Sequence, residues 1–313
     1  MAAIVLVHGI AQEQYSADVL EAQWIPALAG GVRAAGHPEL ADRLWRGPLP
    51  GAPEVRMAFY GNAFLDPGAQ GGTAPIADDD DDQELSEQLA AAWLATAAAQ
   101  AGDSRDRVEA QRYLDNAALG DAGQQGIGAT ARFATNTLTR LKWFAPFGFG
   151  FAEKFVNRSL AQVTRYLSDE AVRKHAQQQV LDLIGPETKL VVGHSLGSVV
   201  AYEALHHTGG PVTLITLGSP LALQSIIYPR LRPQPPIVPP ALAGWENIAD
   251  RDDIVAAHLD LAPFFPPGPG GTVVPTTHAA IDNGAQPHDA AHYLTKRSVG
   301  RIVAEALSEQ RHP

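Results

Sequence analysis

The chain of 313 residues contains no cysteine. Disulfides, thiolate nucleophiles and cysteine-ligated metals are therefore excluded, although this absence identifies no compartment. Basic residues are also scarce: 23 Lys and Arg stand against 34 Asp and Glu, the formal charge is −11, and no basic run occurs. Because a phosphate backbone requires a basic surface, we expect no nucleic-acid partner. No apolar run approaches the ~20 residues that span a bilayer, so we expect no stable membrane insertion.

The first nine residues, Met-Ala-Ala-Ile-Val-Leu-Val-His-Gly, are apolar but form only a short run without a basic start. A secretory signal peptide would need both a basic start and a longer apolar run. This segment is better interpreted as a first core strand, and a cytoplasmic location is the default expectation. The sequence leaves the oligomeric state open.

Short apolar segments alternate with helical segments towards both ends of the chain. Strands are predicted within 4–7, 54–60, 190–192, 212–217, 245–249 and 278–281, and helices over 19–35, 169–184, 196–207 and 293–309. This alternation predicts an α/β fold, with a mostly parallel central sheet and helices on both faces. The helix over 169–184 is well delimited, with Ser168 as its expected N-cap and Gly-Pro at 185–186 after its end.

Residues 62–165 depart from this alternation. They begin with a stretch rich in Gly, Pro and Asp and continue with predicted helices over 83–101, 104–119, 129–143 and 151–167. We interpret 62–165 as a helical cap or lid inserted into a core formed by 1–61 and 166–313. The aspartate run at 78–82 is contiguous, whereas calcium loops space their ligands and turn at glycine, so a solvated loop is the better interpretation.

The most informative motif is Gly193-x-Ser195-x-Gly197. It follows the apolar run Leu-Val-Val at 190–192 and precedes an apolar helical segment. A strand, a sharp turn with small neighbours and a helix form the nucleophile elbow, which projects a serine hydroxyl from the tip of the turn. Ser195 is therefore the candidate nucleophile.

A serine hydroxyl needs a base to accept its proton and a carboxylate to orient that base. Suitable residues follow the later predicted strands, with the carboxylates first and the histidines after them. Asp250, Asp252 and Asp253 come after the strand at 245–249, and His288 and His292 come after the strand at 278–281. The chain order of serine, acid and histidine is the one found in α/β-hydrolases.

Several segments together carry a family resemblance. They are Val-His-Gly-Ile at 7–10, Gly-His-Ser-Leu-Gly at 193–197, Leu-Gly-Ser-Pro-Leu at 217–221, the stretch 245–255 and the stretch 281–295. The chain resembles the α/β-hydrolase fold serine esterases and lipases over its first strand and most of 165–310. The region 62–165 resembles no family that we can name.

The resemblance implies an acid, a base and oxyanion donors. Asp253 is favoured as the acid because Ile254-Val255 follow it, and the family acid is typically followed by x-Val. His288, in the loop before the last helix, is favoured over His292 as the base. An oxyanion hole from the backbone N–H groups of Leu196 and Ile10 is expected.

His194 is next to Ser195, and we expect its side chain to point away from the catalytic face and to serve a structural role. An unusual aromatic stretch runs from 143 to 155 in a chain that is only 7% aromatic. It could form the core of the cap, insert shallowly at a lipid surface, or line an acyl-chain channel. For the channel, the candidate substrate-binding residues are Phe144, Phe147, Phe149 and Phe151.

These residues predict a serine hydrolase that cleaves carboxylic esters, plausibly lipid-like acyl esters, through a Ser-His-Asp triad and an acyl-enzyme. Such chemistry needs no metal or organic cofactor, and the partner is a small-molecule or lipid ester substrate. An acyltransferase or thioesterase using the same triad is an alternative. A non-catalytic binding module on this fold is another, since a fold alone does not establish activity.

Overall fold

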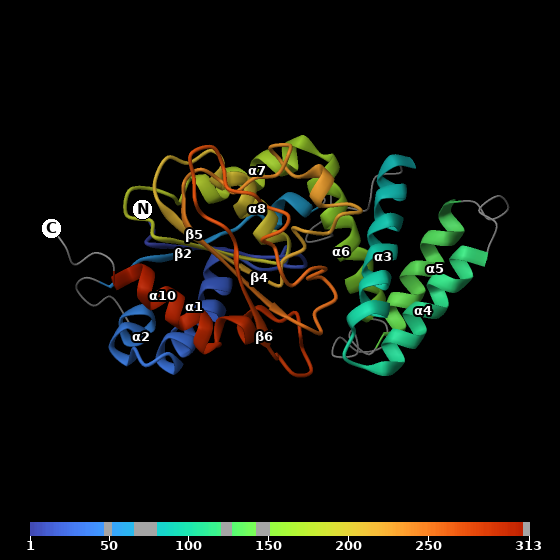
Figure 1. Cartoon of the computed structure of the whole chain (residues 1–313), viewed down its shortest axis with the longest axis horizontal. Helices are drawn as coiled ribbons and strands as arrows, with labels where there is room; N and C mark the ends of the chain where they lie inside the picture. Colours follow the sequence, from blue (N-terminus) through green and yellow to red (C-terminus); the bar gives the residue numbers. More distant parts are fainter. Residues whose placement is uncertain (47–51, 66–79, 120–126, 142–150, 309–313) are drawn as a thin grey trace.

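A single parallel sheet forms the centre of the protein (Figure 1). The computed structural model describes residues 1–46, 52–65, 80–119, 127–141 and 151–308. The six strands lie in the order β2-β1-β3-β4-β5-β6, and every pair of neighbours is parallel. Their bounds are β1 Ile4–Val7, β2 Val55–Ala58, β3 Leu190–His194, β4 Val212–Leu217, β5 Leu242–Asp250 and β6 Thr276–Ile281. The expected α/β fold is confirmed.

Helices cover both faces of the sheet because successive side chains of a strand point to opposite faces. Ile4 and Leu6 of β1 pack in one apolar cluster with α1 (Ala17–Ala34), α2 (Pro38–Trp45), α9 (Ala290–Leu294) and α10 (Arg297–Ser308). Val5 and Val7 pack in a second cluster, with α7 (Glu170–Leu181) and α8 (Leu196–Leu205). Burial on both faces explains why β1 and the start of β3 are continuously apolar.

The chain between β2 and β3 forms η1 (Gly61–Phe64), α3 (Asp80–Gln100), α4 (Ser104–Leu119), α5 (Ile127–Arg140) and α6 (Phe151–Ser168). Helices α3 to α6 pack together at one end of the molecule, while α2 and α10 lie at the other (Figure 1). Leu89 and Trp93 of α3 belong to the same apolar cluster as Val5 and Val7 of the sheet. These helices therefore share a core with the sheet, and the division into cap and core stays a prediction.

Several helix boundaries differ from those predicted by a few residues, and three further differences concern the presence, division or N-cap of a helix. Helix α2 was not anticipated, and the helix expected over 293–309 is two helices, α9 and α10. The N-cap of α7 is Asp169 and not Ser168: the Asp169 carboxylate accepts hydrogen bonds from the N–H groups of Ala171 and Val172. Ser168 instead ends α6, where its hydroxyl donates to the Thr164 carbonyl.

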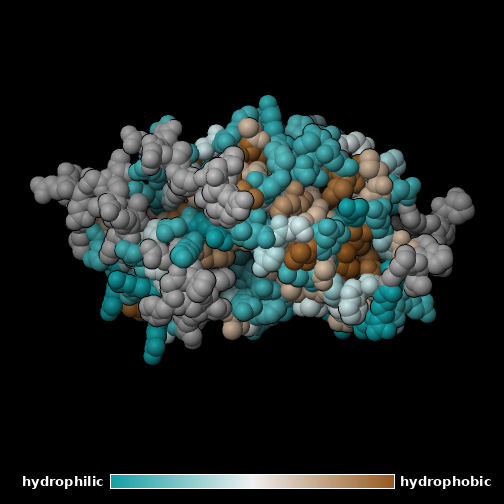
Figure 2. Space-filling view, turned by 180° about the vertical axis from the view of Figure 1, so that it is seen from behind, coloured by the Kyte–Doolittle hydropathy of each residue, from teal (hydrophilic) through white to brown (hydrophobic). Residues whose placement is uncertain are grey.

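Among the coloured residues on the face shown in Figure 2, hydrophilic ones cover a larger area than hydrophobic ones. No helix in the described parts of the chain combines the length and apolar character needed to cross a membrane. The exposed large hydrophobic residues among those described come from separate segments: Met1, Tyr15, Val19, Trp45, Val108 and Val274.

The order of the strands positions the site. From β1 the chain first adds β2 on one side and then, after α3 to α7, adds β3 on the other side. The loops that leave the carboxyl ends of β1 and β3 therefore diverge. In open α/β sheets such a switch point is where a crevice forms and ligands bind.

Candidate active site

Ser195 occupies the sharp turn between β3 and α8, with φ of 53° and ψ of −129°. This left-handed conformation is strained for a residue other than glycine and is typical of functional sites. The backbone of the β1 loop packs tightly against the turn. A Cβ on Gly197 would collide with the carbonyl oxygens of Val7 and His8, and one on Gly9 would lie 2.7 Å from Cβ of Ser195. Small residues are required here because the two loops are in contact.

Asp253 and His288 form a hydrogen-bonded pair. His288 Nδ1 lies 2.7 Å from Oδ2 of Asp253, whose side chain is completely buried. The same oxygen accepts a hydrogen bond of 2.9 Å from the Tyr293 hydroxyl, and Oδ1 accepts one of 3.0 Å from the Val255 N–H. A carboxylate held in this way keeps the His288 proton on Nδ1, which leaves Nε2 as the nitrogen that can accept a proton.

Tyr293 was not singled out by the sequence analysis. Its hydroxyl donates to Asp253 and accepts a hydrogen bond of 2.8 Å from the N–H of Asp250. Burial, followed by the charge of Asp253, raises the pKa of the Tyr293 hydroxyl well above its ordinary value. The hydroxyl therefore keeps its proton at neutral pH and acts as a hydrogen-bond donor to Asp253. A tyrosine five residues after a histidine has no local signature that would have revealed this contact.

Gly218, just after β4, lies behind the same pair. Its φ of +52° favours glycine, and a Cβ here would lie 2.5 Å from Oδ2 of Asp253 and 3.1 Å from Nδ1 of His288. The segment at 217–221 contributed to the family resemblance without an assigned role. The structure supplies one, since this glycine leaves the space that the acid–base pair occupies.

The alternative acid and base candidates lie in other contacts. The Asp250 carboxylate accepts hydrogen bonds from the N–H groups of Asp252 and Asn283, which joins two loops. Nδ1 of His292 lies 3.1 Å from the Asn283 carbonyl oxygen. The structure thus brings His288 to Asp253 and directs His292 to a neighbouring loop.

Ser195 and His288 line one cavity of 460 Å³, at the carboxyl ends of β1 and β3. A cavity of this volume is within the usual range for small-molecule sites. Its other walls come from α1, α6, the loop after β1 and the start of α9. Apolar lining residues include Ile10, Trp24 and Phe155, and polar ones include Gln12, Gln23, Arg158 and Gln286.

The orientation expected for His194 is wrong. Its ring lines the cavity, lies 4.6 Å from the His288 ring between centroids, and its Nε2 is 2.8 Å from the His288 carbonyl oxygen. As the last residue of β3, His194 shares a strand face with Val192, and that face is covered by α1 and α9. Burial lowers the pKa of His194 well below its ordinary value, so the ring is neutral and its Nε2–H donates a hydrogen bond to the His288 carbonyl.

The two candidate oxyanion donors lie on the two loops that line the cavity beside Ser195. Leu196 is the first residue of α8, where backbone N–H groups have no partner within the helix. Ile10 follows β1 and lines the cavity. The preceding peptide is held by His8, whose Nδ1 donates to the Gly9 carbonyl at 2.7 Å, while its Nε2 accepts from the Tyr60 N–H at 3.2 Å. Burial lowers the pKa of His8 to about 4, so this ring is neutral.

The side chains of the predicted acyl-chain channel fall outside the described parts of the chain. Phe144, Phe147 and Phe149 lie outside the described residues. Phe151 begins α6, but its side chain is likewise outside the described part. The last aromatic residue of the stretch, Phe155, does line the cavity with Ser195.

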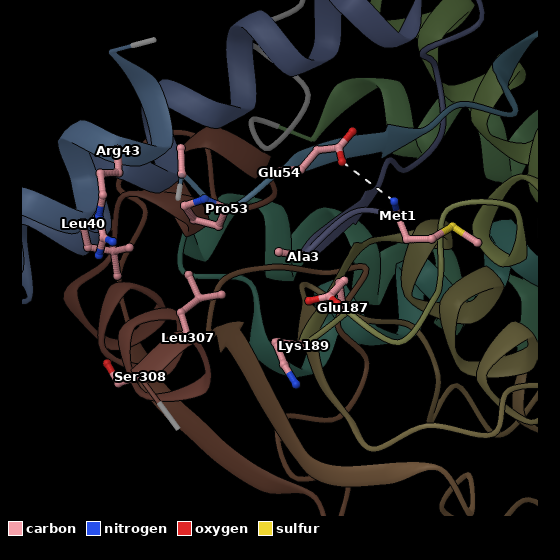
Figure 3. Close-up of a pocket in the computed structure, with 11 residues that line it drawn as sticks. Met1, Ala3, Leu40, Arg43, Pro53, Glu54, Glu187, Lys189, Leu307 and Ser308 are labelled. Carbon is pink, nitrogen blue, oxygen red and sulfur yellow. Dashed lines mark ion pairs between the residues drawn. The ribbon is translucent and has the colours of Figure 1, made fainter. Parts of the chain in front are cut away.

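A larger hollow of 670 Å³ lies at the amino end of the sheet (Figure 3). Its lining includes Ala3 and Lys189, which precede β1 and β3, and the Met1 amino group, 3.9 Å from a Glu54 carboxylate oxygen. It contains none of the residues of the Ser195 cavity. Among the described residues, no group of three or more His, Asp or Glu side chains could hold a metal ion.

Comparison of the chain with protein-family models, with curated proteins and with solved structures finds no match.

Proposed function

We propose that the protein is a serine hydrolase that cleaves carboxylic esters. The observation that carries this proposal is the Asp253–His288 pair, whose histidine shares a cavity with a serine on a left-handed strand-to-helix turn. A buried, hydrogen-bonded carboxylate, an imidazole oriented by it and an adjacent hydroxyl are the three groups that nucleophilic acyl transfer requires.

In the proposed reaction, Nε2 of His288 accepts the proton of the Ser195 hydroxyl as the serine oxygen attacks the ester carbonyl carbon. The oxyanion that forms accepts hydrogen bonds from the N–H groups of Leu196 and Ile10. His288 then gives its proton to the departing alcohol, and the acyl group remains on Ser195. A water molecule, deprotonated by the same imidazole, releases the carboxylic acid. Asp253 stays ionised and stabilises the imidazolium at each step.

The cavity supports an ester with a compact apolar acyl group. Trp24, Phe155 and Ile10 offer an apolar wall beside Ser195, and a volume of 460 Å³ suits a small or medium-sized substrate. A lipid-like substrate would require further apolar space. Rates on p-nitrophenyl esters from acetate to palmitate would measure this, since a compact site predicts a decline beyond medium chain lengths.

Covalent labelling with a fluorophosphonate probe tests the proposal directly. The wild-type protein should be labelled with one probe per chain, and Ser195→Ala should not be labelled. His288→Ala should lose labelling and ester hydrolysis, whereas the matched variant His292→Ala should keep most of both, because His292 contacts Asn283 and not Asp253. Labelling that persists in Ser195→Ala, or equal loss in the two histidine variants, contradicts the proposal.

A further inference from the structure

Ala11, directly after the candidate oxyanion donor Ile10, has a left-handed backbone with φ of 60°. Ala11 and Ser195 are the described residues other than glycine with positive φ, and they lie on the two loops that flank the cavity. For a residue with a Cβ this conformation is unfavourable. It persists only when surrounding contacts hold it, so the contacts of Ala11 are informative.

The N–H of Ala11 is held by a residue from a distant helix. It donates a hydrogen bond of 2.7 Å to Oε1 of Gln162, on α6. Gln162 is itself buried, and its Nε2 donates a hydrogen bond of 2.7 Å to Oε2 of Glu13. One amide thus binds the β1 loop at two points, two residues apart.

The orientation of the Gln162 amide follows from its partners. The Glu13 carboxylate is an acceptor, so the amide nitrogen must face it, and the amide oxygen then faces the Ala11 N–H. Glu13 is completely buried and also pairs with Nε of Arg158, one turn earlier on α6, at 2.9 Å. These contacts make the amide a rigid bridge between α6 and the loop.

The bridge acts on the peptides around Ile10. A peptide unit is planar and trans, so its N–H and C=O point in opposite directions. The carbonyl of Gly9 is held by His8, which sets the direction of the Ile10 N–H. The next peptide is held at its carbonyl by Gln12, with Nε2 3.2 Å from the Ile10 oxygen, and at its N–H by Gln162.

We propose that Gln162 is a positioning residue for the oxyanion hole: from α6 it holds Ala11 in its left-handed conformation and thereby keeps the Ile10 N–H directed into the cavity. This inference rests on the proposed esterase function. It assigns to the inserted helices a part in the reaction itself, in addition to enclosing the substrate.

Gln162→Met removes both hydrogen bonds while keeping a long side chain. We expect kcat to fall about 10- to 100-fold and KM to stay within about threefold of wild type. Complete loss of one oxyanion donor lowers kcat about 10²–10³-fold, and a donor N–H that points away from the oxyanion should lose part of that effect. A boronic acid inhibitor, which forms an anionic adduct with serine, should weaken in parallel with kcat/KM. Gln162→Asn, whose shorter side chain cannot reach both partners, should behave similarly if Gln162→Met does not fold.

The decisive measurement is a rescue. Glycine adopts positive φ at little cost, so adding Ala11→Gly to either Gln162 variant should restore kcat several-fold. Ser159→Ala is the matched control, because Ser159 is buried on the same helix and its hydroxyl donates to the Phe155 carbonyl within that helix. It should keep kcat within about twofold, since a lost local hydrogen bond does not alter the loop.

The outcomes separate this inference from the proposed function. A wild-type protein that is not labelled by fluorophosphonate overturns both. If the wild type is labelled and hydrolyses esters but both Gln162 variants keep wild-type kcat, or Ala11→Gly restores nothing, the positioning role is overturned and the esterase proposal stands.

Discussion

Replacing Asp253 by asparagine would test the acid–base pair with almost no change in side-chain volume. The carboxylate accepts three hydrogen bonds: one on Oδ1 from the Val255 N–H, and two on Oδ2 from the Tyr293 hydroxyl and His288 Nδ1. An amide has one acceptor oxygen and one donor nitrogen, so it cannot satisfy all three donors as they stand.

The structure indicates which of the three donors would lose its hydrogen bond to residue 253. The Val255 N–H is part of the backbone and cannot turn, so the asparagine oxygen should take the Oδ1 position and its NH₂ group the Oδ2 position. The Tyr293 oxygen can accept from that NH₂, but His288 can accept only with its own proton on Nε2. That tautomer cannot accept the serine proton. In a serine protease triad the same Asp→Asn substitution lowers kcat about 10⁴-fold, which corresponds to roughly 5 kcal/mol of activation free energy.

We therefore expect kcat on a short-chain p-nitrophenyl ester to fall about 10⁴-fold in Asp253→Asn, with a melting temperature within a few degrees of wild type. Asp250→Asn is the matched comparison, because that carboxylate binds backbone N–H groups of two loops and no histidine. It should lose stability and less than about tenfold in kcat. A loss below tenfold in Asp253→Asn, or a larger loss in Asp250→Asn, would refute the assignment of the acid.

Three further predictions follow from buried groups near the site. Tyr293→Phe removes a hydrogen bond from the Asp253 carboxylate, and the carboxylate should then stabilise protonated His288 more strongly. The acid limb of the kcat/KM–pH profile should therefore move to higher pH. An acid limb at the wild-type pH would contradict this. Gly9→Ala places a methyl group 2.7 Å from Cβ of Ser195 and should slow fluorophosphonate labelling at least about tenfold. A time course of labelling measures this rate. An unchanged rate would contradict the close contact between the two loops. Burial lowers the pKa of His8 from 6.5 to about 4. The unfolded imidazole binds its proton at higher pH than the folded one, so this contribution to the free energy of unfolding is complete above about pH 6.5 and is lost as pH falls towards 4. The loss should be on the order of 3 kcal/mol. Urea unfolding at pH 7, 5.5 and 4.5 should show the decline, and a free energy of unfolding that stays constant over this range would contradict it.

The sheet could be predicted from local patterns because its strands are buried on both faces and therefore read as short apolar runs. The runs at 4–7, 190–192 and 212–217 each lie in a strand of the structure. Helix α2 escaped prediction because, at eight residues, it is too short to show a helical period clearly, and the break between α9 and α10 has no proline or glycine to mark it. Such boundaries depend on packing against α1.

The elbow at Ser195 is also encoded locally, since small residues at 193 and 197 and a preceding strand are adjacent in the chain. Beyond this, the sequence alone offered a short list of candidates: three aspartates at or just after the end of β5 and two histidines before α10. Only the tertiary structure pairs one member of each list, because residues 35 positions apart meet through the parallel arrangement of β5 and β6.

The contacts that hold this pair and the oxyanion loop are decided by the tertiary structure alone. Gln162 meets Ala11 across 151 positions, and Tyr293 meets Asp253 across 40. His194 turned towards His288, against expectation, because the face of β3 on which it lies is set by its packing against α1 and α9. A local pattern specifies which residues can form a strand, a turn or a helix, whereas hydrogen bonds between distant segments depend on how those elements pack together.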